Sequence, residues 1–218
     1  MKRGIGLILA CALCAIVASC SGKGANGGNT PEAVDLGLSV KWADCNLGAT
    51  SIDDDGDYFS WAETSPKEVY DKENYTYYFD SSSAKYTHLA MKDGGEFVVK
   101  LEASDDAASV NLGGKWRIPT VKEAEELLRM CKWTRYENGF IATGPNGNSI
   151  HFPDTGRMLG DKHTRIEASF WTSELSSTES EEKGTLYSDK MASIAMIGVR
   201  KVGPMYREIG IVIRPVCE

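Results

Sequence analysis

The sequence predicts an α+β domain, built mostly from antiparallel strands with a small number of helices. Three observations carry this prediction: alternating apolar residues over 34–42, a capped amphipathic helix over 120–130, and a β-hairpin over 139–152. The chain has 218 residues, of which 42% are hydrophobic and 25% charged, as in an average globular protein. This length suits one domain with a short appendage.

The N-terminus has the pattern of a bacterial lipoprotein signal. A short positive segment precedes an apolar run from Ile5 to Ala18, which is shorter than the ~20 residues that a membrane-spanning helix needs. The run ends in Val17-Ala18-Ser19-Cys20, which resembles the lipobox whose Cys is acylated and becomes the first residue after cleavage. We therefore expect residues 1–19 to be a signal peptide and Cys20 to carry palmitate and related acyl chains, so that the mature protein is anchored to the membrane without spanning it.

Residues 20–33 predict a tether in front of the domain, which we place at 34–218. The tether is rich in Gly, Ser, Asn and Ala, a composition that buries no core and stays flexible. It would hold the domain ~20 Å from the lipid. We expect an outer-membrane lipoprotein, and the residues after Cys20 leave open whether it faces the periplasm or the cell surface.

The charge of the chain argues against one class of partner. Asp and Glu number 31 against 24 Lys and Arg, which gives a net charge of −7. The sequence has no block of basic residues, so the main source of affinity for a phosphate backbone is missing. We expect no nucleic-acid partner.

Four segments of the first half have local structural signals. Residues 34–40 alternate in polarity and predict a half-buried strand, and Gly56–Trp61 predicts a second one. Residues 64–95 lack periodicity and predict a long irregular excursion. Ser104–Ala108 combines an N-cap with acidic residues, which predicts the start of a short helix.

The helix over 120–130 has the clearest signal. Thr120 and Glu123 have the spacing of a capping box, in which the hydroxyl and the carboxylate each accept a hydrogen bond from a backbone N–H at the helix start. Five apolar residues repeat at helical spacing and predict one buried stripe. They are Val121, Ala124, Leu127, Leu128 and Cys131.

Strands predominate after this helix. Gly139–Thr143 and Ser149–Phe152 predict a hairpin, because Asn146-Gly147 between them supplies the positive φ angles of a tight turn. Later apolar segments predict three more strands, at 169–173, 185–196 and 209–216.

Three of the six cysteines fall in the signal or the lipobox, and three remain in the domain: Cys45, Cys131 and Cys217. Three thiols cannot all pair within one chain. None of them has the Cys-x-x-Cys spacing of a thiolate metal site or a redox motif. An oxidising envelope predicts one disulfide and one spare thiol, and the residues by themselves leave the pairing open.

Several motifs of the domain occur in the order found in one family. They are Asp35–Ala49, Gly56–Thr64, Asp105–Ala108, Gly113–Thr120, Gly144–Ile150 and Ile213–Val216. Together they resemble the Fibrobacter succinogenes major paralogous domain, a lipoprotein family that is abundant in gut Bacteroidetes and lies near the C-type-lectin-like and formylglycine-generating-enzyme-like folds. The resemblance covers about residues 34–218 and is specific for fold, not for activity.

This resemblance implies a compact C-type-lectin-like domain with two helices and a loop-rich, mostly antiparallel second half. It implies that the N- and C-terminal strands lie together. It also implies a disulfide between Cys45 and Cys131, which would leave Cys217 free.

Motifs for metal binding are incomplete. Asp53–Asp57 is similar to a calcium loop, but Tyr58 and Thr64 stand where an EF-hand needs Gly and Glu. Gly144-Pro145-Asn146 lacks the acidic residue of the triplet with which C-type lectins bind sugar through calcium. We expect no metal and no cofactor, and we interpret the two segments as an acidic turn and a hairpin turn.

Catalytic motifs are incomplete too. A formylglycine-generating oxidase needs a pair of cysteines late in the domain, where this chain has Cys217 alone. His88, His151 and His163 lack the spacing of zinc ligands, and no Ser lies in Gly-x-Ser-x-Gly. We therefore expect no catalytic residues.

Tyr70–Tyr86 is rich in aromatic residues separated by Asn, Ser and Lys. This composition suits an amphipathic contact surface, and Tyr75, Tyr77 and Tyr78 are the candidate ligand-binding residues. A loop packed on the domain explains the pattern equally well. The tryptophans are interpreted as core residues; they are Trp42, Trp61, Trp116, Trp133 and Trp171.

These observations predict a cell-envelope lipoprotein that binds a glycan or a protein without catalysis. The alternative is an envelope enzyme, of the formylglycine-generating type or of another type. Stoichiometric copper in the purified protein would favour the alternative.

Overall fold

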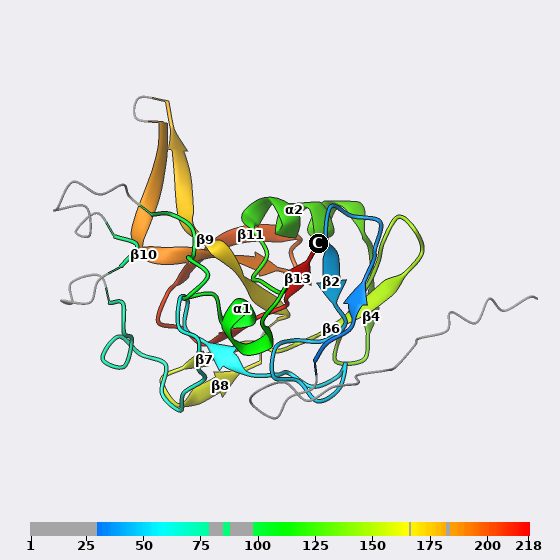
Figure 1. The fold of residues 1–218 in the computed structure, drawn as a ribbon, viewed down its shortest axis with the longest axis horizontal. Coiled ribbons are helices and arrows are strands. Elements are labelled where there is room, and N and C mark those ends of the chain that lie inside the picture. The colour runs from blue at the N-terminus through cyan, green and yellow to red at the C-terminus, as the bar shows by residue number, and fades with distance from the viewer. Residues whose placement is uncertain (1–29, 79–84, 88–97, 166, 182–183) are drawn as a thin grey trace, which may run out of the picture.

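The computed structural model describes residues 30–78, 85–87, 98–165, 167–181 and 184–218. These residues form an α+β domain in which two helices accompany small antiparallel sheets, as the sequence predicts (Figure 1). The expected signal peptide, Cys20 and most of the expected tether lie outside the described residues. None of the described helices combines the length and the apolar character needed to cross a membrane.

The two ends of the domain meet in one sheet. β1 (Ala33–Val34), β2 (Lys41–Ala43) and β13 (Val216–Cys217) lie in the order β1-β2-β13, and both pairings are antiparallel. Within β2, Trp42 pairs with β1 on one side and β13 on the other. The N- and C-terminal strands are therefore neighbours, as expected.

The prediction of one continuous strand over 34–40 is wrong. β1 ends early, and the chain bends before β2 begins. Gly37 has a φ of +73°, and its N–H donates to Oδ1 of Asp35 at 2.7 Å. This local turn offers the backbone an alternative to the strand ladder. Leu36 is nevertheless fully buried, so the apolar alternation reports burial and not an extended strand.

α1 (Ala107–Leu112) begins where the sequence predicts a short helix. Asp106 is its N-cap, and the carboxylate accepts hydrogen bonds from the N–H of Ser109 at 2.9 Å and of Ile118 at 2.8 Å. One side chain thus caps the helix and holds the segment that leads to the second helix.

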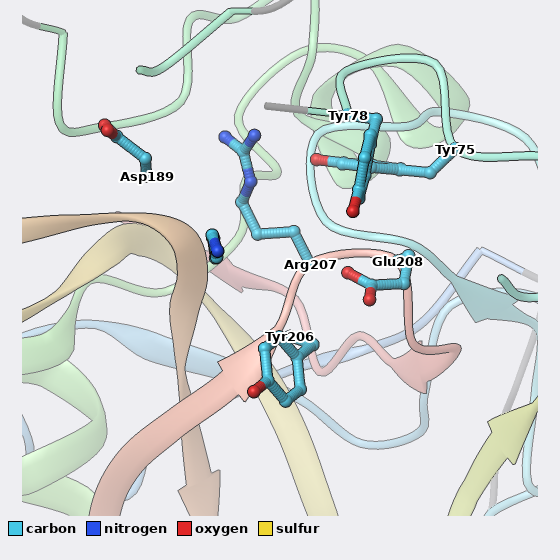
Figure 2. A pocket seen from close by; sticks show the side chains of 7 residues that line it. Tyr75, Tyr78, Asp189, Tyr206, Arg207 and Glu208 are labelled. Atoms are coloured by element: carbon cyan, nitrogen blue, oxygen red, sulfur yellow. The ribbon is translucent and has the colours of Figure 1, made fainter. Parts of the chain in front are cut away.

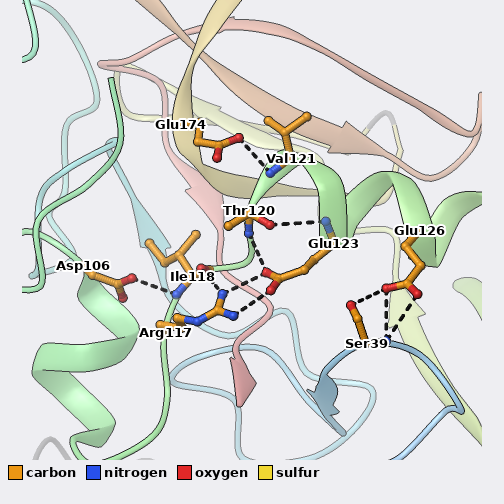
Figure 3. Close-up of polar contacts among 9 residues, drawn as sticks. All are labelled: Ser39, Asp106, Arg117, Ile118, Thr120, Val121, Glu123, Glu126 and Glu174. Atoms are coloured by element: carbon orange, nitrogen blue, oxygen red, sulfur yellow. Dashed lines mark hydrogen bonds and ion pairs between the residues drawn. The ribbon is translucent and has the colours of Figure 1, made fainter. Parts of the chain in front are cut away.

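α2 (Val121–Met130) has the predicted capping box (Figure 3). The hydroxyl of Thr120 accepts from the N–H of Glu123, and the carboxylate of Glu123 accepts from the N–H of Thr120 at 2.8 Å. Arg117 donates to both oxygens of that carboxylate, at 2.6 and 2.8 Å. Glu174 accepts from the N–H of Val121 at 3.1 Å, so a distant segment completes the helix start.

The apolar stripe of α2 faces the core as predicted. Ala124, Leu127, Leu128 and Cys131 are buried, while Val121 is half-buried. On another side of the helix, Glu126 accepts from the backbone N–H and the hydroxyl of Ser39 (Figure 3). This contact ties the helix to the bend in front of β2.

The predicted hairpin after α2 is confirmed and gains a third strand. β4 (Lys132–Tyr136), β5 (Gly139–Thr143) and β6 (Ser149–Pro153) form an antiparallel sheet. β7 (Arg157–Leu159) and β8 (Lys162–Thr164) follow as a separate small hairpin.

The longest strands form a third sheet. β9 (Ser169–Ser180), β10 (Gly184–Met196) and β11 (Lys201–Tyr206) lie in the order β11-β10-β9. β11 pairs only with the second half of β10, from Met191 onward. The end of β9 and the start of β10 therefore stand away from the body as a two-stranded ribbon (Figure 1).

The strand predicted over 209–216 is divided into two. β12 (Ile211–Val212) pairs with β3 (Tyr58–Phe59), and β13 pairs with β2. Arg214 lies between the two short strands and is fully buried. The chain changes sheets at this residue, which a periodicity of two does not reveal.

Arg214 stabilises that change of sheets through four acceptors. Its guanidinium donates to backbone carbonyls and to one side-chain oxygen, and it lies 4.3 Å above the ring of Phe152. Complete burial lowers its pKa to about 10, so the arginine stays protonated in neutral solution. The acceptors are the carbonyls of Ala43, Asp44 and His151 and the Oδ1 of Asn46, at 2.8 to 3.1 Å.

Two main apolar clusters make up the core. The first surrounds Trp42 and the stripe of α2, and the second surrounds Trp61 and Trp171. Trp116 is also buried, and Trp133 packs at the margin of the first cluster. The interpretation of the tryptophans as core residues is therefore confirmed.

The three cysteines of the domain are buried and form no disulfide among the described residues: Cys45, Cys131 and Cys217. The disulfide that the family resemblance implies between Cys45 and Cys131 is not formed in this structure. Cys131 packs with α2 in the first apolar cluster, whereas Cys45 lies within electrostatic range of Arg214. Cys217 lies in a third, smaller cluster with Ala43 and Trp116.

Candidate binding site

Three tyrosines of the aromatic segment over 70–86 pack into the domain. Tyr70, Tyr75 and Tyr86 are buried. The hydroxyl of Tyr70 donates to the carbonyl of Tyr58 at 2.6 Å, and that of Tyr75 donates to the carbonyl of Trp61 at 2.8 Å. These three rings match the alternative of a packed loop. Part of the predicted segment, residues 79–84, lies outside the described residues.

Arg207 holds this segment on the domain. It follows β11 directly, and only 1% of its surface is exposed. Nη2 donates to the carbonyl of Tyr77 at 2.7 Å, and Nη1 donates to the carbonyls of Lys85 and Tyr86 at 3.0 and 3.2 Å. One planar guanidinium thus binds the middle and the end of the aromatic segment, a geometry that a lysine ammonium cannot reproduce.

Among the described residues Arg207 forms no salt bridge, and burial dominates the electrostatics of its guanidinium. Burial lowers the pKa of its guanidinium, and the nearby Asp189 and Glu208 oppose that effect. The guanidinium also lies 5.5 Å from the ring centre of Tyr75 and 5.8 Å from that of Trp61. These two rings provide cation–π stabilisation in place of a paired carboxylate.

A hollow of about 150 Å³ opens beside this arginine. We call it the Arg207 hollow; it is lined by Tyr75, Tyr78, Asp189, Lys190, Tyr206, Arg207 and Glu208. Figure 2 shows Arg207 between Asp189 on one side and the two loop tyrosines on the other, with Tyr206 and Glu208 below. Three separate segments therefore meet here: the aromatic loop, β10, and the end of β11 with the residues after it.

A second hollow is lined in part by other residues of the same loop. We call it the Glu63 hollow; its volume is about 350 Å³, and its lining includes Glu63, Lys67, Asn74, Tyr77 and Asp105. Its charged groups are paired with one another or with their neighbours. Lys67 lies 2.6 Å from Glu63, and Asp105 accepts from Lys85 at 2.6 Å.

The structure thus distributes the three predicted tyrosines over two hollows. Tyr75 and Tyr78 line the Arg207 hollow, and Tyr77 lines the Glu63 hollow. Tyr77 and Tyr78 are half-buried, whereas Tyr75 is only 4% exposed.

Sequence reasoning missed the C-terminal part of the site: Asp189, Lys190, Tyr206, Arg207 and Glu208. These residues belong to no motif, and more than a hundred positions separate them from the aromatic loop. The isolated tyrosine–arginine–glutamate run after an apolar strand carries no recognisable signal by itself.

The carboxylates of the acidic turn at Asp53–Asp57 interact with other residues of the domain. Asp54 accepts from the N–H of Thr50 at 2.9 Å, and Asp55 accepts from Arg165 at 2.6 Å. Asp53 lies 3.0 Å from Nδ1 of His151. In the described part of the chain, no group of three or more His, Cys, Asp or Glu side chains is arranged to hold a metal.

The turn at Gly144-Pro145-Asn146 also has structural partners. The Nδ2 groups of Asn146 and Asn148 donate to the carbonyl of Asp35 at 2.9 and 2.8 Å. A Cβ at Gly144 would lie 2.0 Å from the carbonyl oxygen of Leu36, so only glycine permits this close approach. The triplet joins the hairpin to the bend after β1.

His163 has ordinary partners as well. Nε2 of His163 lies 2.7 Å from the carbonyl oxygen of Thr155 and 2.9 Å from the hydroxyl of Tyr58, which itself donates to that carbonyl. This network fastens the β7–β8 hairpin to β3. His88 lies outside the described residues.

No family model, curated protein or solved structure matches this chain.

Proposed function

We propose that the protein is an outer-membrane lipoprotein of the cell envelope, whose single domain binds a glycan and catalyses no reaction. The proposal includes a C-type-lectin-like fold of the Fibrobacter succinogenes major paralogous type, based on the motif resemblance. The described α+β architecture and the adjacent end strands are compatible with it. The anchor rests on the lipobox at Cys20.

The Arg207 hollow is the observation that carries the binding function. Its walls come from three segments, and Arg207 keeps two of them together through buried hydrogen bonds. The lining places three tyrosines beside four charged side chains, so it offers a ligand both aromatic surface and hydrogen-bonding groups. A small polar hollow suits a glycan better than the flat, larger contact that a protein partner needs.

The state of the cysteines supports a binding protein over a formylglycine-generating oxidase. Such chemistry needs accessible thiols, because the thiolate is the reactive form. Cys45 and Cys217 are fully buried, and burial together with Glu126 raises the pKa of Cys131 to about 11. All three described thiols are therefore poor nucleophiles in the folded domain.

A glycan array tests the proposal directly. The full chain, extracted in detergent, is expected to retain a defined set of glycans that an unrelated lipoprotein in the same detergent does not retain. Metal analysis of the same preparation checks the enzyme alternative. Binding to no glycan, or copper at one atom per chain, would contradict the proposal; a protein ligand without glycan binding would redirect it to protein recognition.

A further inference from the structure

The size of the Arg207 hollow limits what it can hold. Its volume of about 150 Å³ lies below the ~300–1,000 Å³ of sites for drug-sized ligands. It equals the volume of about five water molecules in the liquid. One ring-sized group therefore fits, while the rest of a longer ligand would extend outside.

Three polar groups of the lining lack partners. The Nε of Arg207 is buried and has no hydrogen-bond acceptor among the described residues. Within the part of the chain that the structure describes, the hydroxyl of Tyr206 and the carboxylate of Glu208 make no side-chain hydrogen bond. The hydroxyl of Tyr206 and the carboxylate of Glu208 can therefore bind a ligand in the hollow, whereas the Nε of Arg207 is inaccessible to it.

The charges of the lining cancel. Lys190 and Arg207 contribute two positive charges, and Asp189 and Glu208 contribute two negative charges. An anionic or a cationic ligand would meet groups of its own sign as well as opposite ones, which reduces its affinity. Hydroxyl groups donate and accept at the same time, so they match such a mixed lining without adding charge.

Tyr206 adds an aromatic surface at the margin of the hollow. It is 53% exposed at the end of β11, and Figure 2 shows its ring opposite the tyrosines of the loop. An aromatic ring with a polar tip suits a ligand that is apolar on one face and hydroxylated around its edge. A pyranose ring has this character.

The hollow is also held in shape before any ligand binds. The N–H of Arg207 donates to the carbonyl of Lys190 at 3.2 Å, and its carbonyl accepts from the N–H of Trp61 at 2.8 Å. With its guanidinium bound to three carbonyls, Arg207 is fixed at both ends. A preformed site loses less entropy on binding.

We propose that the Arg207 hollow binds one neutral pyranose unit of a glycan, with Tyr206 stacked on the sugar ring and Glu208 accepting hydrogen bonds from its hydroxyls. This inference rests on the proposed glycan-binding function and adds to it the site and the class of sugar.

The test compares three oligosaccharides of equal length by titration calorimetry with the full chain in detergent: a neutral hexose oligomer, a uronic-acid oligomer and an amino-sugar oligomer. The neutral oligomer is expected to bind at least about tenfold more tightly than either charged one. Tyr206→Ala and Glu208→Gln should each weaken its binding by about tenfold or more. Leu186→Ala is the matched control, because Leu186 is 43% exposed on β10 and lies outside the hollow.

The outcomes separate the two proposals. Neutral-oligomer binding that survives both Tyr206→Ala and Glu208→Gln would overturn this site while glycan binding itself stands. Tighter binding of a charged oligomer would overturn the neutral class. Loss of glycan binding from all preparations, with unchanged thermal melts, would remove the proposed function and this inference together.

Discussion

Nη2 of Arg207 donates a 2.7 Å hydrogen bond to the backbone carbonyl of Tyr77, which lies 130 residues earlier in the chain. The same guanidinium binds the carbonyls of Lys85 and Tyr86. The shape of the candidate site therefore depends on one buried side chain that belongs to neither the aromatic loop nor a regular strand. A substitution there should affect stability and the site together.

Arg207→Ala should lower the free energy of unfolding by about 3 kcal/mol, because three carbonyls lose a charged donor. Arg207→Lys should recover only part of this loss, since an ammonium cannot reach all three acceptors. Arg135→Ala is the control: Arg135 is paired with Asp154 on the surface, and its loss should cost less than about 1 kcal/mol. Urea denaturation measures all three, and equal losses for Arg207→Ala and Arg135→Ala would contradict the assignment.

Leu127→Ala and Thr120→Ala should differ in a fixed order. Leu127 is completely buried in the stripe of α2, so its truncation leaves a cavity and should cost about 2–5 kcal/mol. Thr120→Ala removes only the cap hydroxyl and should cost about 1 kcal/mol. Thermal melts in which Thr120→Ala is the more damaging change would mean that α2 packs differently.

The thiols of the folded protein should react slowly. Cys45 and Cys217 are fully buried, and the raised pKa of Cys131 leaves little thiolate near neutral pH. A chromogenic disulfide reagent should therefore titrate all three thiols only after denaturant is added. Peptide mapping under non-reducing conditions serves as the second readout, and a bridged Cys45–Cys131 peptide would show that the structure and the mature protein differ.

The capping box should make the domain sensitive to acid. Burial alone would raise the pKa of Glu123, but hydrogen bonds from Arg117 and Thr120 outweigh it and hold the pKa below the ordinary 4.5. The stabilisation is therefore fully present above pH 4.5 and is lost as the pH falls through the folded-state pKa.

Glu123→Gln removes that contribution, so the variant should be less stable than the parent at pH 7 and closer to it in strong acid. Denaturation curves across the acid range check this. A constant difference between the two proteins at every pH would show that Glu123 is not the linked group.

Cys20→Ala should release the protein from membranes into the soluble envelope fraction, because the lipobox places the acyl chains on that sulfur. Fractionation and palmitate labelling of the parent and the variant measure this. A variant that stays with the membrane and incorporates palmitate like the parent would contradict the proposal that the protein is a lipoprotein anchored through Cys20.

The sequence by itself determined the elements whose signals are local. The capping box of Thr120 and Glu123, the stripe of α2 and the hairpin over 139–152 form as predicted, although in the turn only Gly147, and not Asn146, has the predicted positive φ. Their determinants lie within a few residues of one another, so the interactions that define them exist in the chain before it folds. The burial of the tryptophans was predictable for a different reason, namely the large apolar area of each side chain.

Tertiary structure alone decided where the last extended segment breaks and where the site lies, whereas the first break comes from a local turn at Asp35 and Gly37. The segments over 34–40 and 209–216 both bury apolar residues, but a local turn divides the first, and the buried Arg214 accompanies a change of sheet in the second. The Arg207 hollow likewise brings together Tyr78, Lys190 and Glu208, which come from three distant segments. Hydrogen bonds of a buried arginine reach across more than a hundred residues, and no local pattern encodes a partner at that separation.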